Sequence, residues 1–219
     1  ASLNGLYPIQ THIRVDFLLV AMNQLVNMAA KYKYMYAGHL KVPMLIRAII
    51  GRSWGQGPQH SQSLQSIFAH VPGLKVVMPA SAQSVIETYQ YAIEHYRGPV
   101  LSLEHRLLYD LDFYLHEQDA LINPFDARVV CEGDAVTIVA VSNMVVEAQK
   151  AARWVKNQSG HTVEIIDIHC LSPVNHELIR RSVAKTRRLI IADSGWIPFG
   201  LAAEVARGII EHDPRILSR

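Results

Sequence analysis

Short apolar runs that alternate with amphipathic segments constrain this chain more than any other feature of its sequence. In the first half, apolar runs and helical periodicity follow one another at 43–50, 61–69, 74–78, 84–96 and 99–103. In the second half, the alternation continues at 136–141, 144–157, 162–168, 175–185, 188–192 and 199–212. Strands that alternate with helices form parallel sheets covered on both faces. The sequence therefore predicts an α/β fold of two doubly wound units.

Local signals refine the ends of these elements. The apolar stripe from Val15 to Ala29 has the spacing of a helix of about 16 residues with one buried side. Tyr7–Ile9 is a short strand candidate before it, and Ser84 and Glu87 stand at the spacing of a capping box. Gly160 is expected to close the helix at 144–157. Three full strands are few for a sheet wound on both faces, so we expect the chain to be incomplete at both ends.

A polar stretch between Leu107 and Arg128 separates the two series. Periodicity disappears there, and Asp, Glu, Asn, His and Pro accumulate as in an interdomain linker. We place the first domain at 1–118, the linker at 119–126 and the second domain at 127–219.

Composition indicates an ordinary globular chain. Of its 219 residues, 50% are hydrophobic and 18% are charged, with a formal net charge of +2, which excludes disorder. No run approaches the ~20 apolar residues of a membrane span. Basic residues in the first 86 positions are scattered without clustered aromatics, which argues against a nucleic-acid surface. Cys131 and Cys170 fit two unpaired thiols in a reducing compartment, the cytoplasm or, in a eukaryote, the mitochondrial matrix.

The densest group of unusual residues follows the expected strand at 43–50. The segment from Gly51 to Gln62 holds three glycines and leads into the next helix, at the sheet edge where ligands bind in open α/β folds. His60 lies in this segment, and its imidazole can take or give a proton near neutral pH. A loop histidine that bonds only to the backbone fits the same pattern. The segment is neither a Walker loop nor a GxGxxG fingerprint, so spacing alone names no ligand.

Several longer stretches resemble one known family. The segments GQGPQHSQ at 55–62, FAHVPGLKVVMP at 68–79 and PVLSLEHR at 99–106 are similar to the β subunits of thiamine-diphosphate-dependent 2-oxoacid dehydrogenase E1 components, of the pyruvate and branched-chain type. Segments at 5–9, 23–31 and 194–200 resemble the same family in the same order. The QHSQ form of the loop differs from that of transketolases, which is closer to DGPTHQ. The resemblance implies a thiamine pyrimidine-binding domain followed by a Rossmann-like transketolase C-terminal domain.

The resemblance also implies roles for three residues. Phe17 matches the aromatic side chain that stacks on the aminopyrimidine ring of the cofactor, and Ile13 matches an apolar neighbour beside it. His60 matches the active-site histidine near the substrate. The diphosphate and its Mg²⁺ are held in this family by an α subunit with a GDG…N motif, which this chain lacks. The implied active site is therefore shared between two chains.

Two features depart from the family pattern. The family activates thiamine with a Glu that lies upstream of the segment matching Gly5–Ile9, whereas the first Glu of this chain is Glu87. We interpret this as missing sequence. Some members hold a structural K⁺ through backbone carbonyls that match Met44, Ala92, Ile93, His95 and Arg97; the charge of Arg97 disfavours such an ion. Glu104 is expected to be solvated or paired with Arg106 rather than to line the cleft.

The implied function is the β-subunit share in the oxidative decarboxylation of a 2-oxoacid, with acyl transfer to the lipoyl group of an E2 partner. The implied assembly is an α₂β₂ heterotetramer that contains a second β subunit, and this chain is expected to be inactive without the α subunit. Two alternatives stay open: a transketolase-like or acetoin-cleaving thiamine enzyme, and a non-catalytic α/β assembly subunit. The sequence does not identify the 2-oxoacid, because the acyl pocket of this family draws on both subunits.

Overall fold

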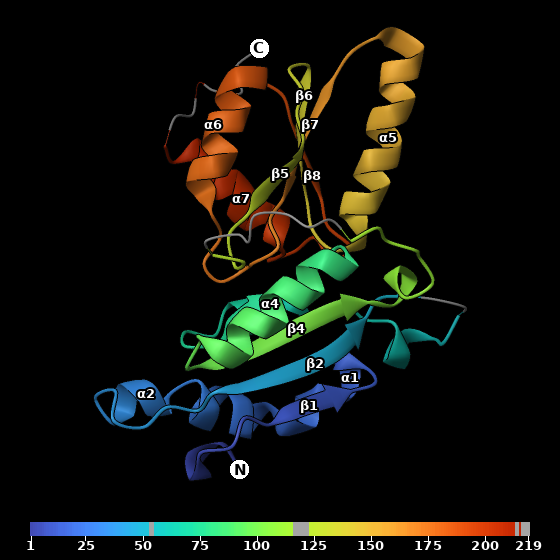
Figure 1. The fold of residues 1–219 in the computed structure, drawn as a ribbon. Coiled ribbons are helices and arrows are strands. Elements are labelled where there is room, and N and C mark those ends of the chain that lie inside the picture. The colour runs from blue at the N-terminus through green and yellow to red at the C-terminus, as the bar shows by residue number, and fades with distance from the viewer. Residues whose placement is uncertain (53–54, 116–122, 213–214, 216–219) are drawn as a thin grey trace.

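Two sheets with helices on both faces form the framework of the chain (Figure 1). The computed structural model describes residues 1–52, 55–115, 123–212 and 215. Both sheets are mainly parallel, which confirms the predicted α/β class. The proposed domain boundary at 118 and the first half of the proposed linker, 119–122, lie outside the described residues, and both stay predictions.

The first sheet has four parallel strands in the order β1-β2-β4-β3. They are β1 (Ile9–His12), β2 (Met44–Ile50), β3 (Lys75–Val77) and β4 (Pro99–His105). The candidate strand at residues 7–9 is therefore a real fourth strand, shifted toward the carboxyl side and paired with β2. The expectation of three full strands was wrong, because a short strand with polar residues gives little apolar signal.

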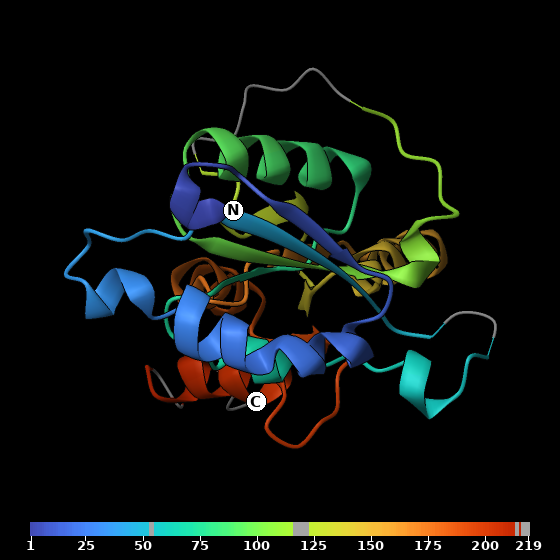
Figure 2. The same ribbon diagram turned by 90° about the horizontal axis from the view of Figure 1, so that it is seen from below.

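One face of the first sheet is covered by α4 (Ala82–Glu94) and the other by the helical stretch 15–29 (Figure 2). This stretch was predicted as one helix. It consists of α1 (Val15–Leu18), a 3₁₀ turn (Leu19–Ala21) and a π-helical segment (Asn23–Ala29). The changes in pitch rotate the apolar stripe, so Val15, Leu18 and Leu25 are buried while Leu19 is 38% exposed.

Two further helices complete the first unit. They are α2 (Tyr32–Met35) and α3 (Gln65–Ala69), and 3₁₀ turns occupy Ser2–Asn4, Pro58–His60 and Arg106–Leu108. The helix predicted at 61–69 begins only at Gln65. Residue Gln62 lies before it, and its carbonyl accepts a hydrogen bond from the Gly51 N–H at 3.0 Å, which ties the segment to the end of β2.

The amino end of α4 corrects the predicted capping box. Ser81 is the N-cap, and its hydroxyl accepts from the Ser84 N–H while the Ser84 hydroxyl accepts from the Ser81 N–H. Helix α4 therefore starts before Ser84, and Ser84 takes the position that a Glu or Gln usually holds. Glu87 lies one turn further along and accepts from Arg128 and Gln83 instead.

The second unit is built on a sheet with the order β5-β7-β6-β8. Its strands are β5 (Arg128–Cys131), β6 (Val136–Ala140), β7 (Val163–Asp167) and β8 (Leu189–Ala192), and its helices are α5 (Asn143–Ser159), α6 (His176–Thr186) and α7 (Leu201–Ile210). Helix α5 covers one face, and α6 and α7 cover the other (Figure 1). Gly160 caps α5 in the left-handed region, as predicted. The antiparallel edge strand β5 was not predicted.

Backbone hydrogen bonds join the two units. The Met78 N–H donates to the His169 carbonyl at 2.8 Å, and the Leu171 N–H donates to the Val76 carbonyl at 2.9 Å. Edge strand β3 thus continues into the second unit through an isolated bridge between Val77 and Cys170. A single cluster of buried apolar side chains also runs from the first unit into the second. This common cluster packs the two units against each other.

Buried polar side chains reinforce this junction. Thr88 on α4 bonds to His169 through their Oγ1 and Nε2 atoms at 2.8 Å, and Arg128 on β5 pairs with Glu87 at 3.2 Å. Asp167 accepts from the His169 N–H at 2.9 Å. Burial raises the pKa of Asp167 to about 7, although Arg128 opposes the shift. Burial, aided by the charge of Arg128, lowers the pKa of His169 to about 3.

Among the described residues, no helix combines the length and the apolar character that a membrane crossing needs.

Candidate functional site

The carboxyl ends of β1 and β2 bring together two residues that lie 43 positions apart. Strand β1 ends at His12, and the chain turns into α1 with Phe17 in its first turns. Strand β2 ends at Ile50, and His60 lies in the segment that follows (residues 55–62, the His60 segment). Because β1 and β2 are parallel neighbours, both segments leave the same edge of the sheet. The rings of Phe17 and His60 meet edge to face, with centroids 5.2 Å apart and planes at 69°.

This pair forms an open platform rather than a closed pocket. Phe17 is 52% exposed and Ile13 is 78% exposed, although both are large apolar side chains. His60 is half-buried. An aromatic ring left half-exposed at the ligand-binding edge of an α/β sheet offers a face for another ring to stack on. The structure therefore brings Phe17 and His60 into contact, and it places Ile13 in the turn between β1 and α1 at the same edge of the sheet.

Hydrogen bonds hold the two sides of the platform. The Gln62 amide donates through Nε2 to Asp16 Oδ1 at 2.7 Å, which links the His60 segment to the residue next to Phe17. The other carboxylate oxygen of Asp16, Oδ2, is buried and has no hydrogen-bond partner among the described residues. Asp16 and Gln62 were not singled out from the sequence. Asp16 is the first acidic residue of the chain and stands beside Phe17, and that position was the available signal.

Gly51 is required at the base of the same segment. Its φ is +77°, in the left-handed region, and a Cβ there would stand 2.1 Å from Nε2 of His105. His105 ends β4 and is buried, and its Nδ1 accepts from the Leu107 N–H at 3.2 Å. Burial, aided by the charge of Arg52, lowers the pKa of His105 to about 4, so the ring is neutral at pH 7.

Glu104 pairs with Arg47, which corrects the expectation of solvation or of pairing with Arg106. The Arg47 guanidinium donates to both carboxylate oxygens, at 2.8 and 2.7 Å, and the hydroxyls of Tyr89 and Tyr109 donate to them as well. Burial acts to raise the pKa of Glu104, but these hydrogen bonds outweigh it and the net shift is downward. Arg106 pairs instead with Asp110 at 3.5 Å.

Glu104 also lines a cavity of about 230 Å³ together with Pro79, Val85, Leu108 and Phe113. Its oxygens are already engaged by Arg47 and two tyrosines. His60 is not among the residues that line this cavity, so the expectation for Glu104 at the cleft beside His60 stays a prediction.

One of the carbonyls considered for K⁺, that of Ile93, already has a cationic neighbour. Arg97 donates to the Ile93 carbonyl at 3.5 Å and to the Glu94 carbonyl at 3.1 Å. His95 lies 3.6 Å from the Glu94 carboxylate, and Ala92 is buried in α4. Met44 lies at the start of β2, paired with Pro99. Among the described residues, no group of three or more His, Cys, Asp or Glu side chains could hold a metal ion.

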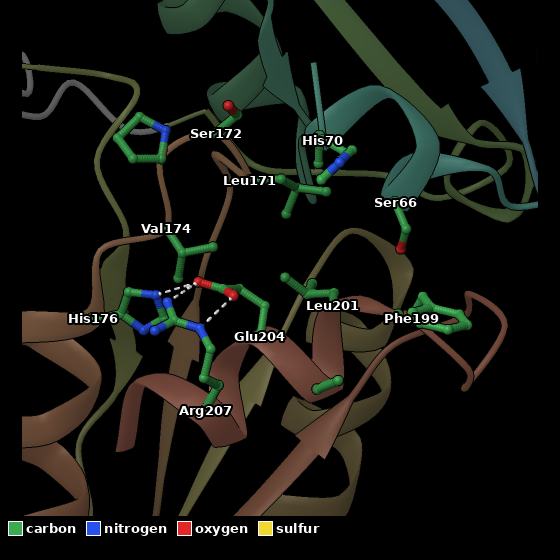
Figure 3. A pocket seen from close by; sticks show the side chains of 14 residues that line it. Ser66, His70, Leu171, Ser172, Val174, His176, Phe199, Leu201, Glu204 and Arg207 are labelled. Atoms are coloured by element: carbon green, nitrogen blue, oxygen red, sulfur yellow. Dashed lines mark hydrogen bonds and ion pairs between the residues drawn. The ribbon is translucent and has the colours of Figure 1, made fainter. Parts of the chain in front are cut away.

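Two larger cavities lie between α3 of the first unit and the segment 194–207 of the second. One, of about 710 Å³, is lined by Gln62, Ile67, Trp196 and Phe199 among others, and so continues from the His60 segment. The other, of about 730 Å³, contains His70, His176, Glu204 and Arg207 (Figure 3). There Glu204 accepts from Arg207 and bonds to His176 Nε2 at 2.9 Å. The hydrogen bond from Arg207 is the main cause that lowers the pKa of Glu204 to about 2.

Two joined, mainly parallel α/β units, with Phe17 and His60 in contact at the carboxyl edge of the first sheet, place this chain among open α/β proteins, which bind their ligands at that edge. Two family models match this chain: the transketolase pyrimidine-binding domain over residues 1–111 and the transketolase C-terminal domain over residues 126–216. The chain therefore belongs to the transketolase pyrimidine-binding family, with a transketolase C-terminal domain after it.

Curated relatives confirm the resemblance to E1 β subunits. The chain is 36% identical to the pyruvate dehydrogenase E1 component subunit beta of Caenorhabditis elegans over 97% of its own length and 61% of the relative's. It is 36% identical to the corresponding subunit of Rickettsia conorii, over 94% and 63%. It is 33% identical to the acetoin:2,6-dichlorophenolindophenol oxidoreductase subunit beta of Cupriavidus necator, over 96% and 62%. The chain thus spans about three-fifths of these relatives.

A solved structure shows the same fold. A chain described as a split gene transketolase, inactive beta4 tetramer, superposes with a TM-score of 0.79 over 97% of this chain and 66% of that chain, at 24% identity. At this identity the match supports the architecture of the two units.

Proposed function

We propose that this chain supplies the pyrimidine-binding half of a thiamine-diphosphate site in a 2-oxoacid dehydrogenase E1 component. The contact between Phe17 and His60 is the observation that carries the proposal, because it joins a stacking face and a proton-transfer group at one sheet edge. The E1 β subunits among the relatives support the same reaction class.

The residues present fit the pyrimidine ring. Phe17 offers a half-exposed face, Ile13 offers an exposed apolar side chain beside it, and the unpartnered Asp16 Oδ2 is an acceptor for a ring amino group. When bound, thiamine diphosphate supplies a carbon nucleophile that permits decarboxylation of a 2-oxoacid. In this proposal, Phe17, Ile13 and Asp16 orient the ring.

His60 is the proposed catalytic residue. Its ring packs on Phe17 and therefore lies within reach of a substrate held beside the stacked ring. One ring nitrogen of His60 can donate a proton or a hydrogen bond to a substrate oxygen on which negative charge develops. A positioned side chain of this kind contributes about 10²–10⁴-fold to the rate.

The proposal requires a partner. The given sequence contains no GDG…N motif for the diphosphate and its Mg²⁺. We propose that an α subunit holds the diphosphate and Mg²⁺, that two β chains join two α chains, and that a lipoyl-bearing E2 accepts the acyl group. The open platform and the exposed Trp196, Ile197 and Phe199 support burial against other chains.

We do not extend the proposal to K⁺. Arg97 donates to the Ile93 carbonyl, so a cation next to that carbonyl would face the Arg97 charge. The two cysteines are free, which supports a reducing compartment such as the cytoplasm or the mitochondrial matrix.

Reconstitution tests the proposed function. The full-length protein would be co-expressed with E1 α subunits that carry the GDG…N motif, and the turnover of pyruvate and of branched 2-oxoacids would be followed with thiamine diphosphate and Mg²⁺. We expect turnover only with both chains, and a fall of about 10²-fold or more for His60→Asn. His39→Asn, on an exposed loop, is the matched control and should leave turnover unchanged. Full activity of His60→Asn, or no turnover with any α subunit, would contradict the proposal.

A further inference from the structure

A hydrogen bond between the two units lies directly behind the His60 segment. The Gln65 amide donates through Nε2 to Asp193 Oδ1 at 2.7 Å, although the two residues are 128 positions apart. Gln65 is the first residue of α3 and is completely buried, whereas Asp193 follows β8 in the second unit. Such a bond between a buried amide and a carboxylate is stronger than one between neutral groups.

Gly195 and two serines surround the bond between Gln65 and Asp193. A Cβ at Gly195 would stand 2.5 Å from Gln65 Nε2 and 2.9 Å from Asp193 Oδ2, so a side chain there would separate the pair. The Gly195 N–H donates to Asp193 Oδ1 at 3.1 Å and holds the carboxylate. Ser63 and Ser194 also meet, with their hydroxyl oxygens 3.4 Å apart. Two side-chain contacts therefore join 63–65 to 193–194.

The same stretch of chain leads straight to the platform. Gln62 lies three residues before Gln65 and is fixed on both sides, through its carbonyl to Gly51 and through its amide to Asp16. His60 precedes it by two residues and rests on Phe17. Residues 61–63 lie outside any helix, and Leu64 is the N-cap of α3, where its carbonyl accepts from the Ile67 N–H at 3.1 Å. The path of this stretch is therefore set by the two bonds of Gln62 and by the start of α3.

We propose that Gln65 and Asp193 are positioning residues, through which the second unit fixes the path of the His60 segment and the contact of His60 with Phe17. Asp193 anchors the start of α3, α3 sets the end of the segment, and the segment presents the imidazole. In the part of the chain that the structure describes, the side-chain hydrogen bonds of Gln65 and Asp193 involve neither Phe17 nor His60. This inference rests on the proposed function only where it concerns catalysis; the effect on the segment stands without it.

An exchange of the two functional groups tests the inference. Gln65→Glu sets two carboxylates against each other, whereas the double variant Gln65→Glu/Asp193→Asn restores an amide and a carboxylate with their places exchanged. The matched control is Gln83→Glu on α4, where the wild-type amide donates to Glu87 at 2.8 Å in the same way but away from α3. Gln65→Met removes the donor without adding charge and serves if Gln65→Glu does not fold.

The first measurement is hydrogen–deuterium exchange of the backbone amides at 55–64 in the full-length protein. We expect about tenfold faster exchange in Gln65→Glu or Gln65→Met, a return to within about twofold of wild type in the double variant, and no change in Gln83→Glu. Unchanged exchange at 55–64 in a folded single variant, or no recovery in the double variant, would overturn the inference.

The second measurement is made on the α–β assembly. We expect kcat to fall in the single variants and to recover in the double variant, with KM for the 2-oxoacid nearly constant, because the segment positions a proton-transfer group rather than the bulk of the substrate. A rise in KM alone would overturn the catalytic part. If the wild-type assembly shows no turnover while the variants still differ in hydrogen–deuterium exchange as expected, the proposed function is refuted. The positioning role of Gln65 and Asp193 for the segment would then stand.

Discussion

Replacing Glu104 by Gln should destabilise the first unit strongly, because Glu104 is the acceptor for three donors. Its side chain is 8% exposed, and its carboxylate accepts from Arg47, Tyr89 and Tyr109. In Glu104→Gln the amide nitrogen becomes a donor that faces other donors, and Arg47 loses its counter-charge. Breaking a buried ion pair from one side costs about 3–5 kcal/mol. The Arg47 side chain is 32% exposed, so solvent screens part of the loss and we expect about 3 kcal/mol.

Urea denaturation of the purified protein measures this loss. Because 1 kcal/mol shifts Tm by about 2–4 °C in a chain of this size, the same variant should melt about 6–12 °C lower. The pKa of Glu104 is lowered in the folded state, so its contribution is present above the unfolded value near 4.5 and disappears as the pH falls through the folded pKa. The difference between wild type and variant should therefore be full at pH 7 and shrink below about pH 4.

Glu147→Gln is the matched control for this prediction. Glu147 accepts from Lys150 at 2.7 Å on the exposed face of α5, and such surface pairs contribute about 0–1 kcal/mol. A Glu104→Gln variant no less stable than Glu147→Gln would show that the Arg47–tyrosine cluster does not stabilise the sheet, and would refute the reasoning.

Two other variants test the base of the site and the junction of the units. Gly51→Ala should lower the free energy of unfolding by about 2 kcal/mol or more, since it adds both left-handed strain and a 2.1 Å approach to His105; Gly38→Ala, with a φ of +84° and no atom within 4 Å, should show the strain alone. If chemical denaturation gives the same loss of unfolding free energy for Gly51→Ala and Gly38→Ala, the steric clash with His105 is refuted. Asp167→Asn should make stability rise more steeply with pH between about 4 and 6.5. The raised pKa of Asp167 makes the folded state bind the extra proton there, which opposes the rise that comes from the lowered pKa of His169. The free energy of unfolding would be measured at pH 4.5 and 6.5 for both proteins. An equal change between the two pH values in wild type and Asp167→Asn would contradict the raised pKa of Asp167.

The elements that the sequence predicts well are those with long apolar runs. Strands β2, β4, β6 and β7 are largely buried on both faces and are mainly apolar in sequence, so both sheets could be predicted. Strand β5 is a four-residue antiparallel edge strand with partly exposed side chains, and neither its length nor its pattern separates it from a loop. The changes of pitch within 15–29 leave no mark on the apolar spacing of the sequence.

The site divides in the same way. The placement of His60 after a buried strand could be predicted, and the resemblance supplied Phe17 and Ile13. The partner of Glu104 could not, because Arg47 reaches it from a neighbouring strand 57 positions away, whereas Arg106 is close only in sequence. The bond between Gln65 and Asp193 depends on how the two units meet, which no local pattern reports.

The affinity of the assembled enzyme for thiamine diphosphate, measured by isothermal titration calorimetry with Mg²⁺ for wild type and Phe17→Ala, tests most directly whether this chain holds the pyrimidine ring. Ile86→Ala on α4 is the matched control, since Ile86 is 48% exposed and Phe17 is 52% exposed. Loss of the stacking face should raise Kd about tenfold or more in Phe17→Ala and leave the control unchanged. An unchanged Kd in a folded, assembled Phe17→Ala enzyme would contradict the account.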